Sequence, residues 1–89
     1  MSELEIKHLI AEQCFVVDLA GTQARLEYQF TPALSEGKPG RINFSHTYVP
    51  PELRGQGVAE KLVRTGLQWA QQEQFEIRAS CWYVAKFLR

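Results

Sequence analysis

The spacing of apolar residues changes period once along this chain, at a glycine-rich junction spanning residues 49–59. Before the junction, apolar and polar side chains alternate, as they do in half-buried strands. After it, from about Gly57 to Ala70, apolar residues recur at helical spacing and predict an amphipathic helix. Gly66 interrupts this stripe at a cost of about 1 kcal/mol relative to alanine, which close packing on a sheet would explain. The pattern predicts a sheet with a helix on one face.

The alternating segments predict a mostly antiparallel sheet. Strands are expected at residues 6–10 (the weakest signal), 14–19, 24–30, 42–48 and 75–79. Gly21 and Thr22 are typical of a turn, and the Pro- and Gly-rich residues 32–40 of a loop. The strand–helix–strand order after residue 42 predicts a right-handed parallel crossover. A short closing helix should follow, with Ser80 as its N-cap.

Size and charge limit what the protein can be. Its 89 residues are expected to form a single domain, residues 1–89, because a chain of this length buries only about 60% of its unfolded surface. A formal net charge of zero gives no general attraction to nucleic acid or to anionic membranes, so neither is an expected partner. No apolar run is long enough to span a membrane, and the acidic start from Met1 to Glu5 does not resemble a secretory signal. We therefore expect a cytoplasmic protein; its oligomeric state is left open.

Cysteine and histidine are sparse in the sequence. Cys14 and Cys81 are expected to be free thiols, as is usual in cytosolic proteins, and Cys14 lies in an apolar strand and should be a core residue. His8 and His46 lie far apart, and no Cys/His spacing suits a metal ion, so no metal is expected.

The junction itself follows a strand and opens a helix. Backbone N–H groups at a helix start lack partners within the helix and bind phosphate well. The junction has neither the Lys-Ser/Thr pair of a P-loop nor the third glycine of a dinucleotide fingerprint, so alone it is equally a structural loop. In a parallel crossover, however, the junction and Cys81 follow neighbouring strands at one edge of the sheet, where ligands bind in open α/β folds.

With its flanks, the junction resembles the acyl-CoA pyrophosphate loop of the GNAT superfamily of N-acetyltransferases. The resemblance rests on residues 54–59, on the preceding residues 45–53 and on residues 80–84, and it covers about residues 24–89. The minimal, single-domain members are the most similar. The resemblance implies an α/β (α+β) fold with a mixed, mostly antiparallel sheet, one crossover helix and a short C-terminal helix. It also implies an acyltransferase that uses acetyl-CoA as cosubstrate and acetylates an amine that the sequence does not identify.

The resemblance assigns roles by position. It implies that the CoA pyrophosphate is held by backbone N–H groups from Arg54, Gly55, Gln56, Gly57, Val58 and Ala59, and that Val49 faces the pantetheine arm. It implies Cys81 and His46 as a catalytic pair. Trp82 is bulky where relatives often have a small residue, which would narrow the acyl pocket. The strand before the junction has no obvious glutamate base.

Each candidate residue also has an ordinary structural interpretation. Cys81, at a helix start, could present a thiolate to a thioester, or it could be a small buried hydrophobe. His46 alternates in phase with Ile42 and Phe44, so it should point to the apolar face, as a core residue or as a base for the thiol or the amine. Arg54 could contact phosphate or be a solvated loop residue. Two other functions remain: an acyl-CoA-binding or sensing module with little turnover, and an interaction domain with a structural glycine loop.

Overall fold

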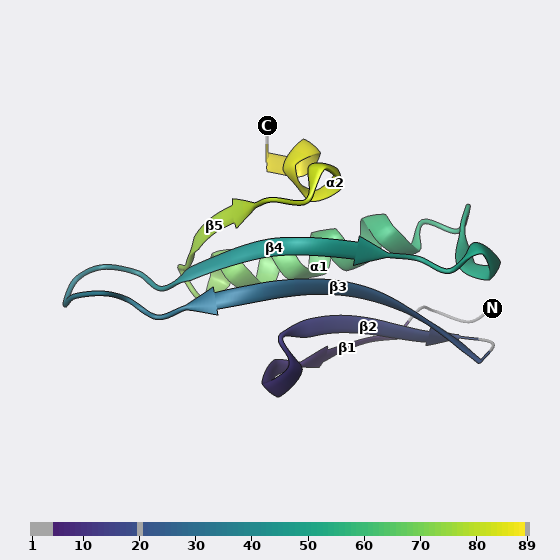
Figure 1. Ribbon diagram of the computed structural model, residues 1–89, viewed down its shortest axis with the longest axis horizontal. Helices are drawn as coiled ribbons and strands as arrows, with labels where there is room; N and C mark the ends of the chain where they lie inside the picture. Colours follow the sequence, from purple (N-terminus) through teal and green to yellow (C-terminus); the bar gives the residue numbers. More distant parts are fainter. Residues whose placement is uncertain (1–4, 20, 89) are drawn as a thin grey trace.

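Figure 1 shows the computed structural model, in which a five-stranded sheet packs against the long helix α1. The structure describes residues 5–19 and 21–88. The strands are β1 (Ile6–Leu9), β2 (Cys14–Leu19), β3 (Thr22–Thr31), β4 (Arg41–Tyr48) and β5 (Glu76–Ala79), and the helices are α1 (Val58–Gln72) and α2 (Trp82–Ala85). Short 3-10 segments occupy Ile10–Glu12, Pro51–Leu53 and Lys86–Leu88. This is the mixed sheet with a crossover helix and a short final helix that the sequence predicts.

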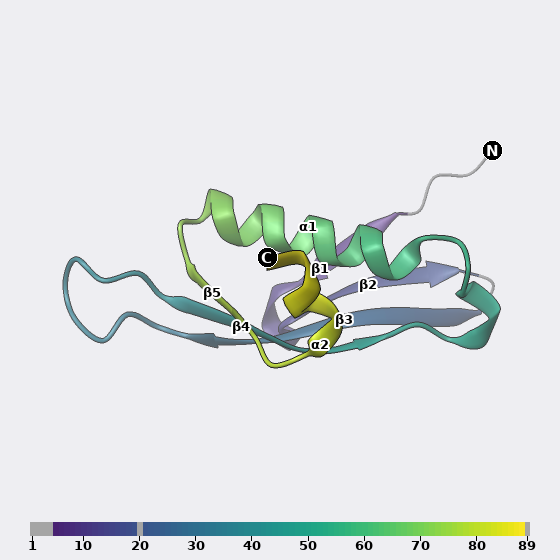
Figure 2. The same cartoon turned by 90° about the horizontal axis from the view of Figure 1, so that it is seen from above.

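The strands follow one another across the sheet in chain order. The neighbours from β1 to β4 are antiparallel, and β5 lies parallel to β4, with Arg41 opposite Glu76 and Phe44 opposite Ala79. Helix α1 makes the crossover between β4 and β5 and lies along one face of the sheet (Figure 2). Because β4 and β5 are parallel, the glycine junction and the chain after β5 emerge at the same end of the pair, as predicted.

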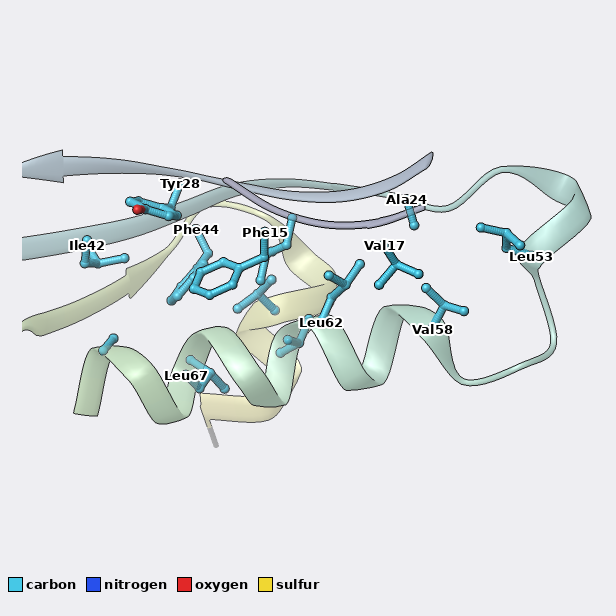
Figure 3. Close-up of a cluster of buried hydrophobic side chains, with 14 residues drawn as sticks. Phe15, Val17, Ala24, Tyr28, Ile42, Phe44, Leu53, Val58, Leu62 and Leu67 are labelled. Carbon is cyan, nitrogen blue, oxygen red and sulfur yellow. The ribbon is translucent and has the colours of Figure 1, made fainter. Parts of the chain in front are cut away.

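The core lies between that face and α1. Alternate side chains of β2, β3 and β4 point toward the apolar side of the helix (Figure 3). The fully or almost fully buried members are Phe15, Val17, Ala24, Leu26, Tyr28, Ile42, Phe44, Leu53, Val58, Leu62, Val63, Leu67, Ala70 and Val84. Gly66 fits among them because a Cβ there would lie 2.9 Å from the Leu26 Cδ2 atom. The close packing expected at Gly66 is confirmed.

The opposite face of β2 is also buried. Cys14 and Val16 are 0% and 1% exposed, although they point away from α1. The Arg25 side chain extends beside them from β3, and its Nη2 atom donates to the Cys14 Sγ atom at 3.5 Å. Burial raises the pKa of the Cys14 thiol. Cys14 is thus the core residue that the sequence predicts, and both it and Cys81 are free thiols.

The alternation of β4 breaks at Ser45. Tyr28 lies opposite Phe44, whereas Glu27 lies opposite His46, so Ser45 is the additional residue of a β-bulge. Beyond the bulge, the phase of the strand is reversed, and His46 is exposed on the face away from α1. The prediction that His46 shares the apolar face with Phe44 is therefore wrong. Counting alternate residues cannot anticipate an extra residue within a strand.

The last helix begins one residue later than predicted. Cys81, not Ser80, is the N-cap of α2. The Ser80 hydroxyl instead accepts a hydrogen bond from Asn43 Nδ2 at 3.1 Å, which holds it against β4. The first strand is also shorter than expected, because Ile10 begins a 3-10 segment.

Candidate functional site

β4 and β5 separate at the end of their shared ladder. The last pair in the ladder joins Phe44 to Ala79, and the backbone N–H groups of Ser80 and Cys81 both donate to the Phe44 carbonyl, at 3.1 and 3.2 Å. β4 continues as residues 45–48 while the chain turns away into α2 (Figure 1). This part of β4 therefore has no strand partner on its β5 side within the described residues. Its edge offers backbone donors and acceptors to a ligand.

Two cavities adjoin this split. The junction cavity, of about 220 Å³, is lined by Val49, Leu53, Arg54, Gly55, Gly57, Val58, Ala59, Glu60 and Tyr83. The thiol cavity, of about 250 Å³, is lined by Thr47, Tyr48, Val49, Arg54, Ala59, Cys81, Trp82 and Tyr83. Four residues line both cavities: Val49, Arg54, Ala59 and Tyr83. The two cavities therefore form a cleft that leads from the glycine junction to the Cys81 thiol.

The junction presents free backbone donors. Gly55 and Gly57 adopt positive φ angles of 80° and 73°, and Gly57 is the N-cap of α1 without a side-chain cap. Among the hydrogen bonds of the described residues, none is donated by a backbone N–H of residues 55–60; the first is Lys61 N–H to the Gly57 carbonyl, at 3.1 Å. These N–H groups and the positive end of the helix dipole suit an anion.

Six of the seven predicted cofactor residues line the junction cavity: Val49, Arg54, Gly55, Gly57, Val58 and Ala59. Gln56 does not, because its Nε2 atom turns back to the Glu52 carbonyl at 3.2 Å. The Arg54 Nε atom donates to the Val49 carbonyl at 3.1 Å and thereby joins the loop to the end of β4. Val58 is 1% exposed, so its side chain belongs to the core.

Glu60 also lines the junction cavity, although the sequence did not point to it. An unpaired carboxylate there would repel a phosphate. The Arg64 Nε atom lies 2.8 Å from the Glu60 Oε2 atom, one turn along α1, and offsets that charge.

The half-buried Cys81 thiol lies at the other end of the cleft. The Thr47 Oγ1 atom is 3.6 Å from its Sγ atom. Burial acts to raise the pKa of Cys81, but hydrogen bonding to the backbone at Val84, Tyr83 and Thr47 and to the Thr47 hydroxyl outweighs it, so the pKa lies below its ordinary value. The thiolate is the reactive form of cysteine, and these donors favour it.

The structure does not bring His46 to Cys81. His46 is absent from the lining of the thiol cavity, and none of the hydrogen bonds in the described part of the chain joins it to the thiol. Thr47 lies beside the Cys81 thiol instead of His46, and the sequence did not point to Thr47. The only signal was the polar run Ser45-His46-Thr47 inside an otherwise alternating strand.

Two aromatic side chains lie at the opening of the thiol cavity. Trp82 is 72% exposed and Tyr48 is 45% exposed, and both line the cavity. The Lys86 Nζ atom lies 5.1 Å from the centre of the Trp82 ring, within cation–π range. Trp82 therefore lies at the rim of the cavity.

Within residues 5–19 and 21–88, no group of three or more His, Cys, Asp or Glu side chains is placed to hold a metal ion. In the same residues, no helix has the length and apolar character needed to cross a membrane.

The splayed parallel pair, the crossover helix and the short final helix define a small α+β domain of the GNAT-like fold. Residues 14–89 match the family of GCN5-related N-acetyl-transferases, and the chain belongs to this family. Protein NATD1 of Xenopus tropicalis is 28% identical over 90 residues, which are 99% of this chain and 77% of that protein.

Two solved structures share this fold. A GCN5-like protein from Staphylococcus aureus, determined by NMR, is 33% identical with a TM-score of 0.64, over 99% of this chain and 80% of that one. An aminoglycoside acetyltransferase from a soil metagenome shares the fold, with a TM-score of 0.65 at 20% identity. The chain spans about half of that larger protein, 53% of its length.

Proposed function

We propose that this protein binds acetyl-CoA and transfers the acetyl group to an amine. The observation that carries the proposal is the row of unused backbone N–H groups at residues 55–60, at one end of a cleft whose other end holds the Cys81 thiol. Membership of the GCN5-related family supports acetyl-CoA as the ligand.

The cleft suits the parts of CoA in order. The pyrophosphate would lie on the N–H groups of the junction, where the helix dipole and the Arg54 guanidinium favour negative charge. The pantetheine arm would pass Val49 and follow the unpaired edge of β4. The thioester would then reach the thiol cavity.

Two routes lead from the thioester to an acetylated amine. The amine can attack it directly, or the Cys81 thiolate can attack first. In the second route an S–C bond forms at Cys81, the C–S bond to CoA breaks, and CoA leaves as a thiolate that takes up a proton. The amine then attacks the Cys81 thioester, an N–C bond forms, the amine loses a proton, and the Cys81 thiolate is released.

His46 is proposed as the base for the amine rather than for the thiol. Its exposed side chain lies one residue from Thr47 on β4, on the face away from α1. A neutral imidazole there can take the proton of an amine that approaches from solvent.

A second candidate is an acyl-CoA-binding or sensing role with little turnover. No Asp or Glu side chain is among the described residues that line the thiol cavity, so no carboxylate base is at hand there. This observation favours binding without efficient transfer.

Calorimetric titration with acetyl-CoA and intact mass after incubation separate these candidates. Both candidates require heat of binding, so the absence of both heat and a thermal shift would refute both. An acetyl adduct that disappears in Cys81→Ala would support the covalent route. An acetylated product from a panel of amines, with no such adduct, would support direct transfer. Binding with neither adduct nor product would favour the sensing role.

A further inference from the structure

Among the described residues, the Cys81 sulfur has a hydrogen-bond partner and no charged group acts on its pKa. Hydrogen bonding to Thr47 on β4 and to the backbone at Tyr83 and Val84 in α2 lowers the pKa of Cys81. The side-chain partner of the sulfur is the Thr47 hydroxyl, whose Oγ1 atom lies 3.6 Å from the Sγ atom. It is therefore the one donor that a substitution can remove without changing the backbone.

The bulge at Ser45 brings this hydroxyl to the sulfur. Past the bulge, Thr47 lies opposite Leu26, which is buried under α1, whereas His46 lies opposite Glu27 on the other face. Strict alternation from Phe44 would have placed His46, not Thr47, on the side of the cleft. Because of the additional residue Ser45, the neighbour of the thiol is the Thr47 hydroxyl and not the His46 imidazole.

The titratable and charged groups around the thiol come from three elements. Tyr48 comes from β4, Arg54 from the junction, and Tyr83 from α2, while α1 contributes the apolar Ala59. The Arg54 Nε atom is already bonded to the Val49 carbonyl. Lys86 lies over the rings of Trp82 and Tyr83, at 5.1 and 5.0 Å from their centres. The hydrogen bonds, not these charges, bring the pKa of Cys81 below its ordinary value against the effect of burial.

We propose that Thr47 is the positioning residue of the acyl-transfer step, whose hydroxyl donates to Cys81 Sγ and holds the ionised sulfur at the cleft. The proposal rests on the proposed function for its reaction. Thr47 transfers no proton: the thiol loses its proton to water, and the hydroxyl keeps its own. The sulfur then attacks the thioester carbonyl, and the hydrogen bond is released as the Cys81 thioester forms.

The test measures the pH profile of Cys81 alkylation by iodoacetamide, followed by peptide mass so that the buried Cys14 is counted separately. It needs no acetyl-CoA. Thr47→Val keeps the shape of the side chain but removes the donor, and should move the midpoint of the profile up by roughly half to one pH unit. Thr47→Ser keeps the donor and should restore the wild-type midpoint. His46→Gln, the matched neighbour, should leave the midpoint unchanged.

In the alkylation assay, three results would overturn the proposal: a wild-type midpoint in Thr47→Val, a midpoint in Thr47→Ser as high as in Thr47→Val, or an equal rise in His46→Gln. Thermal melting checks that the variants are folded, and Thr47→Ala replaces Thr47→Val if the latter is not. With acetyl-CoA, Thr47→Val should acetylate Cys81 more slowly at pH 7 but bind acetyl-CoA as wild type does; equal acetylation rates would refute the role in transfer. A raised midpoint with no acetylation even in wild type would refute the covalent transfer but leave the hydrogen bond established.

Discussion

Gly66 shows how one missing side chain sets the distance between α1 and the sheet. A Cβ at this position would lie 2.9 Å from Leu26 Cδ2 and 3.0 Å from Phe44 Cε1. Both neighbours are fully buried and have little room to move. A larger residue at this position would push α1 away from the sheet. The closer packing of the two layers therefore offsets the lower helix propensity of glycine.

We expect Gly66→Ala to lower the free energy of unfolding by about 1 kcal/mol. Overpacking costs about 1–3 kcal/mol, and the better helix propensity of alanine returns up to about 1 kcal/mol. Urea unfolding followed by circular dichroism measures the change. Gln68→Ala, at an exposed position of the same helix, should change the value by less than about 0.5 kcal/mol. A more stable Gly66→Ala would contradict the packing seen here.

His46 gives a second prediction at the scale of single residues. If it takes the proton of the amine, His46→Gln should slow acetyl transfer to the amine by about 100-fold or more. Acetylation of Cys81 itself should keep its wild-type rate, because His46 lies on the other face of β4. Single-turnover kinetics with acetyl-CoA separate the two steps. An equal loss in both steps would place His46 at the thiol after all.

At the scale of elements, the backbone before α1 takes its shape from Gly55 and Gly57, both of which have positive φ angles. The space around these two glycines is where the proposed anion would bind. Gly57 has a φ of +73°, and a Cβ there would meet no atom within 4 Å. In the loop after β3, Gly37 has a φ of +79° and the same open surroundings. A side chain at either Gly37 or Gly57 would therefore bring the same backbone strain. Of these two positions, Gly57 alone lines the cleft.

This pair gives a matched test of the junction. Gly57→Ala and Gly37→Ala should each lose about 1–2 kcal/mol of stability from the left-handed backbone. Only Gly57→Ala should weaken acetyl-CoA binding, by about tenfold or more, because its methyl group projects into the space that the anion would occupy. Calorimetric titration of both variants gives the comparison. Equal affinities would mean that the junction does not hold the phosphates.

At the scale of the whole molecule, His8 joins the first strand to the core. Its ring stacks on Phe15 with centres 3.9 Å apart, lies 4.5 Å from the Trp69 ring, and its Nε2 atom is 2.7 Å from the Tyr28 hydroxyl oxygen. Burial lowers the pKa of His8. The unfolded chain therefore binds the proton more readily than the folded protein does. The stability from neutral His8 is fully present above its ordinary pKa and is lost as the pH falls from that value through the lower pKa of the folded protein.

The free energy of unfolding should thus be lower at about pH 5.5 than at about pH 7.5, on either side of the ordinary histidine pKa. His8→Phe keeps the stacked ring and should reduce the difference. Gln68→Ala, at an exposed position of α1, should keep the wild-type difference. Glu76, whose pKa is lowered by Arg78 and Arg41, loses its contribution only at more acidic pH. An unchanged difference in His8→Phe would assign the effect to other groups.

Much of the molecule could be predicted from the sequence, because it depends on local periodicity. The alternation from Ala24 to Phe30, the helical stripe after Gly57 and the parallel crossover rule gave the sheet, the helix and the common edge that holds the junction and Cys81. The rest depends on contacts that a linear pattern does not contain. The orientation of Gln56 follows from a bond to the Glu52 carbonyl, and the outward turn of His46 follows from the bulge.

The bulge at Ser45 makes the number of residues in β4 as important as their identity. Deleting Ser45 would restore simple alternation, turning His46 inward beside the thiol and Thr47 outward to solvent. Loss of one codon would therefore exchange a hydroxyl for an imidazole at the sulfur without a single substitution. Related proteins that differ in length at this point of the strand can carry different chemistry at the same cysteine.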